Sequence, residues 1–469
     1  MLSAAPDDRK TLALKALAAA GIVLYGLQIA KSVSGSTGPA GFHLPIGAIV
    51  LVCAPPALIA MLRMPIIFPF GLYVALLPFD PLLSVSSGAT LVRLLGILTV
   101  VALVVQMLLT RRMMPLRAPW YCWLAFIVWG ATSMLWSVEF EHGKQIYGIF
   151  LQNFALMSIL AVYPLTKRDF NAVVALMIGG GVVSVLYAIG PSGLGGGTTR
   201  ISIASSGGNV VDQNFFATSF MLPVAFAFAA AISGKRLWLR AVYFAAAAAM
   251  MLGVLVSGSR GGFIALVLMM VYFAVRSRSL VQVGLLFAAF VGLLIRYPLV
   301  WLRFLHDDGG GTGSGRTDIW HVGLQALHGH WLFGTGVGTF QESYARVYLL
   351  AYQHSGQGWT RPAHNVFLGM AVELGIVGLA LMVYAWYRSF RSLRVIPRGS
   401  PNFALRTACE AGMLALMVQS LFIDAMWIKF FWLGFSLPFM LLNVESVRVA
   451  AARRVQAFAQ VVSAPARAS

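Results

Sequence analysis

The sequence contains few charged residues, and few of those are acidic. Asp, Glu, Lys and Arg make up 10% of the 469 residues, only 15 of them Asp or Glu, whereas hydrophobic residues make up 59%. Soluble domains usually carry about 25% charged residues, so this composition excludes an ordinary soluble domain. Apolar runs long enough to cross a bilayer core recur along the chain, and they do not alternate as barrel strands do. We therefore predict an all-α polytopic membrane protein.

Cysteine is also scarce. Cys53, Cys122 and Cys409 lie in or beside apolar runs, with no metal-ligand spacing and no obvious disulfide partner, so we interpret them as packing residues. The segments predicted to face outward carry no cluster of Asp, Glu or His at ligand spacing, and no glycine loop typical of nucleotide binding. The sequence therefore predicts no metal and no cofactor.

Fourteen apolar segments are candidate membrane spans. The pair 46–63 and 65–79 is short and interrupted by prolines, and the first segment has no clear cleavage site, so we expect a retained helix. The candidate spans are 11–30, 46–63, 65–79, 91–110, 119–137, 145–165, 170–190, 213–232, 237–256, 261–275, 279–298, 364–387, 406–423 and 428–444.

The net charge of +19 is explained by the placement of the basic residues. With the N-terminus in the cytoplasm, most of the 34 Lys and Arg residues fall in short inner loops or in the tail after Val444. Cytoplasmic loops hold such an excess, so both termini are predicted to be cytoplasmic. The basic residues then attract anionic membrane lipid, and no nucleic-acid partner is expected.

Three segments on the predicted outer side stand out. The Gly- and Ser-rich segment 191–212 surrounds Arg200, the turn 257–262 contains Arg260, and 299–363 is the longest outer loop. Long loops in compact proteins are often functional. We divide the chain into spans with outer turns over 1–298, a large loop over 299–363, C-terminal spans over 364–444 and a cytoplasmic tail over 445–469.

The large loop is predicted to hold two amphipathic helices. In the first, Arg316 to Leu332, the spacing of Trp320, Leu324, Leu327 and Trp331 places them on one face. A glycine-rich break at Gly334–Gly338 precedes the second, in which Phe340, Tyr344 and Val347 share a face. Helices of this kind lie in the membrane interface, and we expect them to roof an outer cavity.

His364 stands beside this loop, at the start of a new apolar helix. An imidazole has an ordinary pKa near 6.5 and can take a proton from a hydroxyl near neutral pH. We therefore select His364 as the candidate catalytic base, with Asn365 orienting it or the substrate. The alternative is a histidine that only caps a helix at the membrane interface.

Arg200 and Arg260 are the candidates for binding an anion. Each lies among small residues, and guanidinium groups bind phosphate through paired hydrogen bonds. The alternative for each is an arginine that reaches lipid headgroups. Arg316, Arg346 and Arg361 are further candidates for substrate binding. The carboxylates in or near apolar spans are Glu373, Glu410 and Asp424. Such carboxylates are often paired or functional, and structural pairing is expected for Glu373.

At these residues the sequence resembles the O-antigen ligase family, within the O-antigen ligase and polymerase superfamily. The resemblance rests on His364-Asn365 followed after nine residues by Gly375 and after two more by Gly378. The turn Ser-Gly-Ser-Arg-Gly-Gly, the segment Arg316-Thr-Asp-Ile-Trp320 and the Phe333–Phe340 stretch are also similar to the superfamily. The family usually has twelve spans, so fourteen is a departure, although both counts are even.

The resemblance implies a GT-C-type glycosyltransferase that needs no metal or nucleotide and acts on the periplasmic face of the bacterial inner membrane. The donor would be an undecaprenyl-pyrophosphate-linked glycan and the acceptor the lipid A core oligosaccharide of lipopolysaccharide. Arg200 and Arg260 would hold the pyrophosphate, and His364 would deprotonate the acceptor in an inverting displacement. An O-antigen polymerase or a protein O-oligosaccharyltransferase is the alternative within the superfamily, and a lipid or polysaccharide transporter is the alternative of another class.

Overall fold

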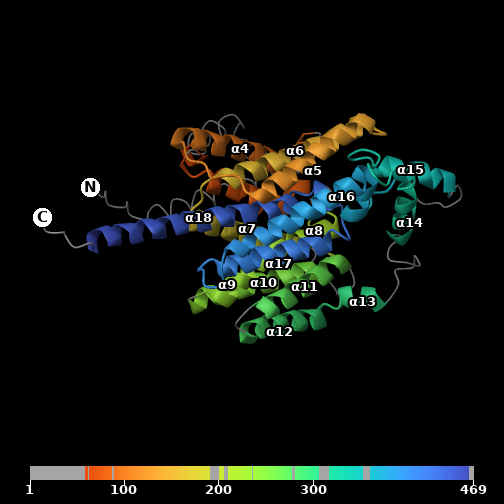
Figure 1. Cartoon of the computed structure of the whole chain (residues 1–469). Coiled ribbons are helices and arrows are strands. Elements are labelled where there is room, and N and C mark those ends of the chain that lie inside the picture. Colours follow the sequence, from red (N-terminus) through yellow and green to blue (C-terminus); the bar gives the residue numbers. More distant parts are fainter. Residues whose placement is uncertain are drawn as a thin grey trace, which may run out of the picture.

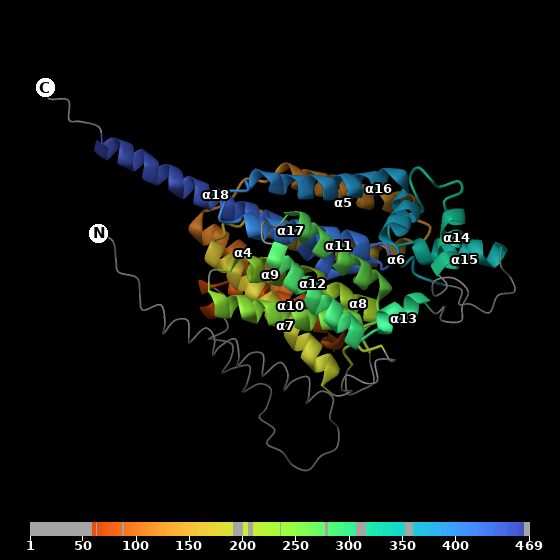
Figure 2. The same ribbon diagram turned by 90° about the horizontal axis from the view of Figure 1, so that it is seen from below.

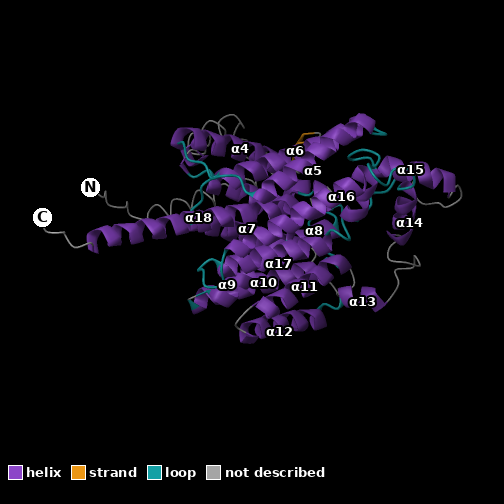
Figure 3. Cartoon of the chain, viewed as in Figure 1, coloured by secondary structure: helices purple, strands orange, loops and turns teal. Residues whose placement is uncertain are grey.

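The computed structural model describes residues 59–61, 63–86, 89–190, 200–204, 210–234, 236–276, 280–305, 316–351 and 360–463. Within these ranges the protein is a bundle of helices with one short antiparallel strand pair, β1 (Ser84–Ser86) and β2 (Ala89–Thr90) (Figure 3). The predicted all-α polytopic fold is thereby confirmed. The predicted span 11–30, most of the span 46–63, and parts of the outer segments 191–212 and 299–363 lie outside the described residues.

Every predicted span from 65–79 onward coincides with a helical segment. The segment at the first of these spans, 65–79, is not one continuous helix: it changes from a π-helix to an α-helix and then to a 3-10 helix. The N-terminal half of the described chain contains η1 (Ile66–Gly71), α3 (Leu72–Leu76), η2 (Leu77–Leu82), α4 (Leu91–Thr110), α5 (Ala118–Ser133), η3 (Met134–Trp136), α6 (Phe140–Val162), α7 (Lys167–Ile189), α8 (Gln213–Ser219) and α9 (Met221–Ser233).

The C-terminal half is likewise helical, and α13 to α15 belong to the large loop. Its elements are α10 (Leu237–Val256), α11 (Arg260–Arg276), α12 (Leu280–Arg296), α13 (Leu299–Leu305), α14 (Arg316–Ala326), α15 (Phe340–Ala351), α16 (Val366–Ser392), η5 (Leu393–Val395), α17 (Phe403–Gln419), η6 (Ala425–Trp427) and α18 (Lys429–Ser463).

Seven of the described helices are long and apolar enough to cross a membrane. They are Leu91–Thr110, Phe140–Val162, Lys167–Ile189, Gln213–Ser233, Leu237–Val256, Val366–Val395 and Lys429–Gln456. Shorter helices, among them α5, α11, α12 and α17, fill the other predicted spans.

The bundle has two chemically different ends because neighbouring helices run in opposite directions. The last residue of α11, Arg276, pairs with Glu410 near the middle of α17, and Asn402, just before α17, bonds Glu445 near the middle of α18. We call this the basic end; the C-terminal part of α18 projects from it (Figure 1). The starts of α11 and α16 lie at the opposite end with α13, α14 and α15, which we call the site end (Figure 2).

An aromatic cluster fixes α16 against α5 and α18. The ring of Trp123 on α5 lies 4.5 Å from that of Phe435 on α18, and Trp386 on α16 lies 5.0 Å from Phe431 in an edge-to-face arrangement. Trp123 also donates its indole N–H to Ser389 Oγ at 3.1 Å. Buried aromatic pairs of this kind add about 0.5–1.5 kcal/mol beyond the area they bury. The cluster holds α16 rigidly, and so sets where its first residues lie.

Gly375 breaks α16 on the way to the site end. Its φ is +68°, in the left-handed region, and a Cβ added there would lie 2.2 Å from the carbonyl oxygen of Leu332. Gly334, with φ of +74°, faces the break from the other side, and its added Cβ would lie 2.3 Å from Glu373 O. Two backbones therefore touch here, which only glycine permits.

The segment between α14 and α15 supplies hydrogen bonds to the broken helix. Thr335 N–H donates to Val372 O at 2.9 Å, and Gly336 N–H donates to Glu373 O at 2.8 Å. A broken helix leaves carbonyl groups without their usual partners, and these donors satisfy them. The large loop is thus attached to α16 through backbone contacts.

Candidate functional site

His364 is held by backbone contacts just before α16. Its N–H donates to Asp424 Oδ2 at 3.0 Å, and the N–H of Val366 donates to Ser420 O at 2.8 Å. The φ of His364 is +46°, in the left-handed region that non-glycine residues seldom occupy. Such strain costs about 1–3 kcal/mol and persists only where the surroundings impose it, often at functional sites.

Helix α14 of the large loop reaches the same segment. The indole N–H of Trp320 donates to Ala363 O at 3.1 Å, one residue before His364. On the other side Asn365 caps α16, because its Oδ1 accepts the N–H groups of Phe367 and Leu368 at 3.0 and 3.2 Å. The Asn365 side chain thus has a structural role, and its predicted substrate contact stays a prediction.

The imidazole of His364 and the carboxylate of Asp424 lie close enough for each charge to act on the other, and the hydrogen bond between the two residues comes from the His364 backbone. Burial lowers the pKa of His364 from 6.5; the negative charge of Asp424 opposes this, and the positive charge of Arg316 adds to it. Burial raises the pKa of Asp424 from 3.8, opposed by His364, by two backbone N–H groups and by Arg316. A lowered pKa leaves His364 neutral near pH 7, which is the state a general base requires.

Arg316, the first residue of α14, joins this pair to the arginines of the neighbouring elements. Burial lowers the pKa of its guanidinium; Asp212 opposes the change, and Arg260 and Arg303 add to it. These charges therefore act on one another across α8, α11, α13 and α14. An accumulation of guanidinium groups beside a neutral imidazole is suited to a polyanionic ligand.

Two arginines hold the turn that precedes Arg260. Arg200 Nε donates to Ser257 O at 2.9 Å, and Arg303 Nη1 donates to Gly258 O at 2.6 Å. Gly258 has a φ of +64°, and a Cβ added there would lie 3.1 Å from Arg200 Cγ. Glycine thus permits the close approach of Arg200, and the two guanidinium groups fix the start of α11.

The same turn is tied to α8. Ser259 is fully buried, and its hydroxyl donates to Asn214 Oδ1 at 2.9 Å. Asp212 caps α8, since its Oδ1 accepts the N–H groups of Asn214 and Phe215, both at 2.9 Å. The small residues of the Ser-Gly-Ser-Arg-Gly-Gly turn therefore serve helix packing, and the turn places Arg260 at the site end.

The structure brings most of the predicted site residues to one place. Arg361 lies close enough for its charge to act on His364, and Arg200, Arg260 and Arg316 lie around the neighbouring turn. Arg346 differs: it is exposed on α15 and donates to Val138 O, in the segment before α6, at 3.3 Å.

Glu373 and Glu410, two carboxylates predicted to lie in or near apolar spans, have structural partners. Glu373 accepts the N–H groups of Gly338 at 2.8 Å and Phe340 at 3.4 Å, and so caps α15. Glu410 pairs with Arg276 and Arg406 at the basic end. The structural role predicted for Glu373 matches its position.

The inner face of α14 is not the one that the aromatic spacing indicated. Ile319, Val322 and Ala326 are buried against α15 and α16, whereas Leu324 is 56% exposed. Helix α14 ends at Ala326, so Trp331, which is 62% exposed, lies beyond it in a turn. In α15, Phe340 and Tyr344 are buried as their spacing indicated.

Residues 244–383 match a family model described as O-antigen ligase. This part of the chain is therefore similar to the O-antigen ligase family. The matched segment runs from α10 into α16 and contains Arg260, Arg316 and His364 with the two motif glycines Gly375 and Gly378. No curated protein matches the chain.

The structure also explains the spacing of the family motif. Gly375 accommodates the backbone of Leu332 at the break in α16, and Gly378 lies under Trp129, whose Cδ1 would be 3.0 Å from an added Cβ. Trp129 donates its indole N–H to Leu374 O at 2.9 Å. The glycines therefore shape the helix, and His364 stands at its start.

Three residues of the site were not identified from the sequence. Arg303 and Asp212 were not selected, and Asp424 was assigned no partner. Asp424 interrupts an apolar stretch on the predicted outer side, and Asp212 has the type and position of a helix cap. The sequence therefore contains a signal for Asp424 and for Asp212, but neither signal shows which residue each carboxylate contacts. For Arg303 no sequence signal distinguishes it from an ordinary loop arginine.

Proposed function

We propose that this O-antigen ligase family protein transfers a glycan from undecaprenyl pyrophosphate to a sugar hydroxyl of the lipid A core, as a GT-C-type enzyme at the periplasmic face of the inner membrane. The family domain supports glycan transfer of the ligase or polymerase type. The observation that carries the proposal is the position of α14, which bonds Ala363, the residue before His364, through the indole of Trp320 at 3.1 Å and begins at Arg316. The charge of Arg316 acts on His364, on Asp424 and on Arg260.

In this proposal the arginines bind the donor. Arg200 and Arg260, with Arg316 beside them, would hold the diphosphate and stabilise its negative charge as it departs. Preorganised donors aimed at developing charge are often the largest contribution to catalysis. Arg361, three residues before His364 and close enough for its charge to act on it, would contact donor or acceptor, and the apolar surfaces of the neighbouring helices would hold the isoprenoid.

His364 would act as the general base on the acceptor. The acceptor hydroxyl loses its proton to the neutral imidazole, and its oxygen forms a bond to the anomeric carbon. The bond from that carbon to the diphosphate oxygen breaks, and undecaprenyl pyrophosphate leaves with the electron pair. One displacement inverts the configuration, and Asp424 stabilises the imidazolium that forms.

A reconstituted assay tests this role. Purified protein in detergent, given lipid-linked donor and lipid A core, should join them without an ion gradient; a transporter would not. His364→Ala should lower the rate by about 10²–10⁴-fold, the usual contribution of a general base. His330→Ala changes an exposed histidine of the same loop and serves as the matched control. A His364→Ala enzyme of normal activity and expression would rule out the base.

A deletion strain separates the two superfamily activities. For a ligase, lipopolysaccharide loses its long glycan while lipid-linked polymer accumulates. For a polymerase, lipopolysaccharide carries single repeats. Transfer to a protein instead of lipid A core in the reconstituted assay would indicate the protein O-oligosaccharyltransferase.

A further inference from the structure

The basic end contains a cavity of about 190 Å³ that the proposed transfer reaction does not use. It is far larger than the roughly 10–15 Å³ needed for one water molecule. Helices α9, α11 and α17 and the segment before α17 form its walls. Its lining is Ala229, Ile232, Ser233, Phe273, Arg276, Arg398, Phe403, Ala404 and Thr407. Most of this lining is apolar, and two arginines provide its charge.

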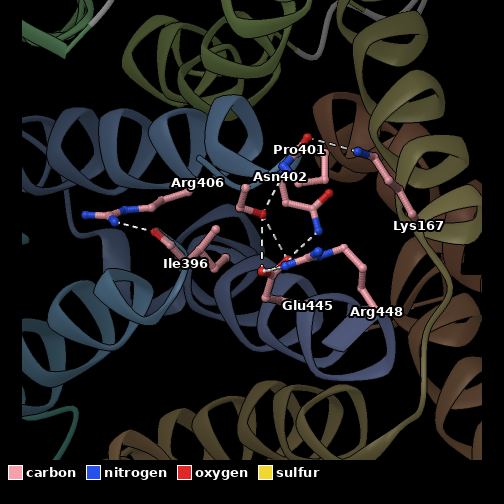
Figure 4. A network of polar contacts seen from close by, with 8 residues as sticks. Lys167, Ile396, Pro401, Asn402, Arg406, Glu445 and Arg448 are labelled. Atoms are coloured by element: carbon pink, nitrogen blue, oxygen red, sulfur yellow. Dashed lines mark hydrogen bonds and ion pairs between the residues drawn. The ribbon is translucent and has the colours of Figure 1, made fainter. Parts of the chain in front are cut away.

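The charge inside the cavity is not balanced by the carboxylate behind it. Glu410 Oε2 accepts from Arg276 Nη2 at 3.2 Å, and Glu410 Oε1 accepts from Arg406 Nε at 2.8 Å, so one carboxylate serves two guanidinium groups. Arg406 also donates to Ile396 O at 2.5 Å (Figure 4). The Nε of Arg276 is buried without a hydrogen-bond partner. The guanidinium carbon of Arg276 lies 5.5 Å from the centre of the Phe403 ring, another residue of the cavity lining.

A second positive charge stands at the rim. Arg398 is exposed, and among the described residues no carboxylate pairs with it. Another carboxylate of the basic end, Glu445, has partners of its own: it accepts from Asn402 at 2.7 Å and pairs with Arg448 at 2.6 Å (Figure 4). The cavity thus presents an excess of positive charge over an apolar wall.

The position of the cavity suits a lipid. Helix α11 is 17 residues long, so at 1.5 Å per residue Arg276 lies about 25 Å from Arg260, near the thickness of a bilayer core. Helix ends of this kind lie at the level of lipid headgroups, where basic pockets between spans bind anionic headgroups. A free anion would bind the arginines but would make no contact that explains the apolar wall, whereas a lipid would contact both.

We propose that this cavity binds an anionic glycerophospholipid, with its phosphate between Arg276 and Arg398 and its acyl chains along Phe273 and Phe403. Under the predicted topology this lipid belongs to the cytoplasmic leaflet. The site is separate from His364, so the binding does not depend on the proposed transfer.

Native mass spectrometry of the full chain released from nanodiscs tests the proposal. Nanodiscs contain equal parts of phosphatidylglycerol and phosphatidylcholine, and we expect phosphatidylglycerol to be retained preferentially. Arg398→Gln should reduce retention about fivefold, since one basic side chain near an anionic surface contributes about a kilocalorie per mole and 1.4 kcal/mol is tenfold. Ala404→Phe, which fills the cavity without changing charge, should abolish it. Arg394→Gln, exposed in the same region but outside the cavity, is the matched control.

Each remaining outcome has one meaning. Equal retention of both lipids, or retention unaffected by Arg398→Gln and Ala404→Phe, would overturn the lipid site. Displacement of phosphatidylglycerol by inorganic phosphate alone would assign a free-anion site instead. His364→Ala should retain the lipid as the wild type does, so a failed transfer proposal and a failed lipid proposal give different results.

Discussion

At the scale of single residues, His364 gains its chemistry from its neighbours. Its backbone is strained, its N–H is bonded to Asp424, and burial keeps its imidazole neutral. The same histidine on an exposed loop would have an ordinary pKa and free rotation. These surroundings make the His364 imidazole suitable as a base. Two predictions follow from single residues of the site.

The first concerns pH. Because the pKa of His364 is lowered from 6.5, the transfer rate should fall on acidification with a midpoint under pH 6.5 and level off at higher pH, where the imidazole is neutral. Asp424 favours the protonated imidazole, so Asp424→Asn should move the acid limb to still lower pH. The measurement is the pH profile of single-turnover transfer. A midpoint above 6.5, or an acid limb that Asp424→Asn leaves in place, would contradict it.

The second prediction compares two arginines of the large loop. Arg316→Gln should lower the transfer rate about 10–100-fold, because a charged hydrogen bond to a ligand contributes about 1.5–3 kcal/mol. Arg346→Gln, on exposed α15 and turned to Val138 O, should change it less than about twofold. Rates at saturating donor, with the donor Kd, measure both. If both variants lowered the transfer rate equally, the position of Arg316 would not matter and only the total charge of the loop would.

At the scale of elements, the break in α16 connects the large loop to the site. The loop segment from Leu332 to Gly336 docks on the broken backbone, and α14 contacts Ala363. Loop and histidine are therefore positioned by the same helix. A change at the break is expected to disturb both.

Gly375→Ala tests this connection. The new Cβ would lie 2.2 Å from Leu332 O at a φ of +68°, so the change should destabilise the protein by about 2 kcal/mol or more. Gly369→Ala lies on the same helix, where the added Cβ meets only Ala363 Cβ at 3.6 Å, and should be tolerated. Thermal unfolding in detergent compares them. Equal unfolding midpoints would show that the backbone contact is not required.

At the scale of the whole molecule, charged residues gather at the two opposite ends of the helix bundle. Arg260, Arg316 and His364 share the site end, while Arg276 and Arg448 lie at the basic end. This separation follows from antiparallel packing of helices whose ends carry different residues. It is the arrangement expected if the site end is periplasmic and the termini are cytoplasmic.

Cysteine labelling tests that orientation. In a background without Cys53, Cys122 and Cys409, His330→Cys introduces an exposed thiol at the site end and Gly399→Cys one at the basic end. A membrane-impermeant maleimide added to spheroplasts should label the first, and should label the second only after lysis. The reverse labelling pattern would show that the site end faces the cytoplasm, and the predicted orientation would be wrong.

The sequence by itself determined the class of protein, because apolar length is the requirement for crossing a membrane. It also located the helices from 65–79 onward, the glycine turns and His364, since those signals are local. The faces of α14 were less predictable: the aromatic spacing marked Trp320 and Leu324, but packing against α15 and α16 buried Ile319 and Val322.

Only the tertiary structure decided the partners. Asp424 is sixty residues from His364 in the chain, and Arg303 and Arg200 hold a turn that neither adjoins. Glu373, whose pairing was predicted without a partner, caps a helix in the loop. Such contacts depend on which helix ends meet, and this is set by the packing of buried side chains across the whole bundle. Local sequence specifies the functional groups, whereas their pKa values and their ligand geometry arise from helix packing.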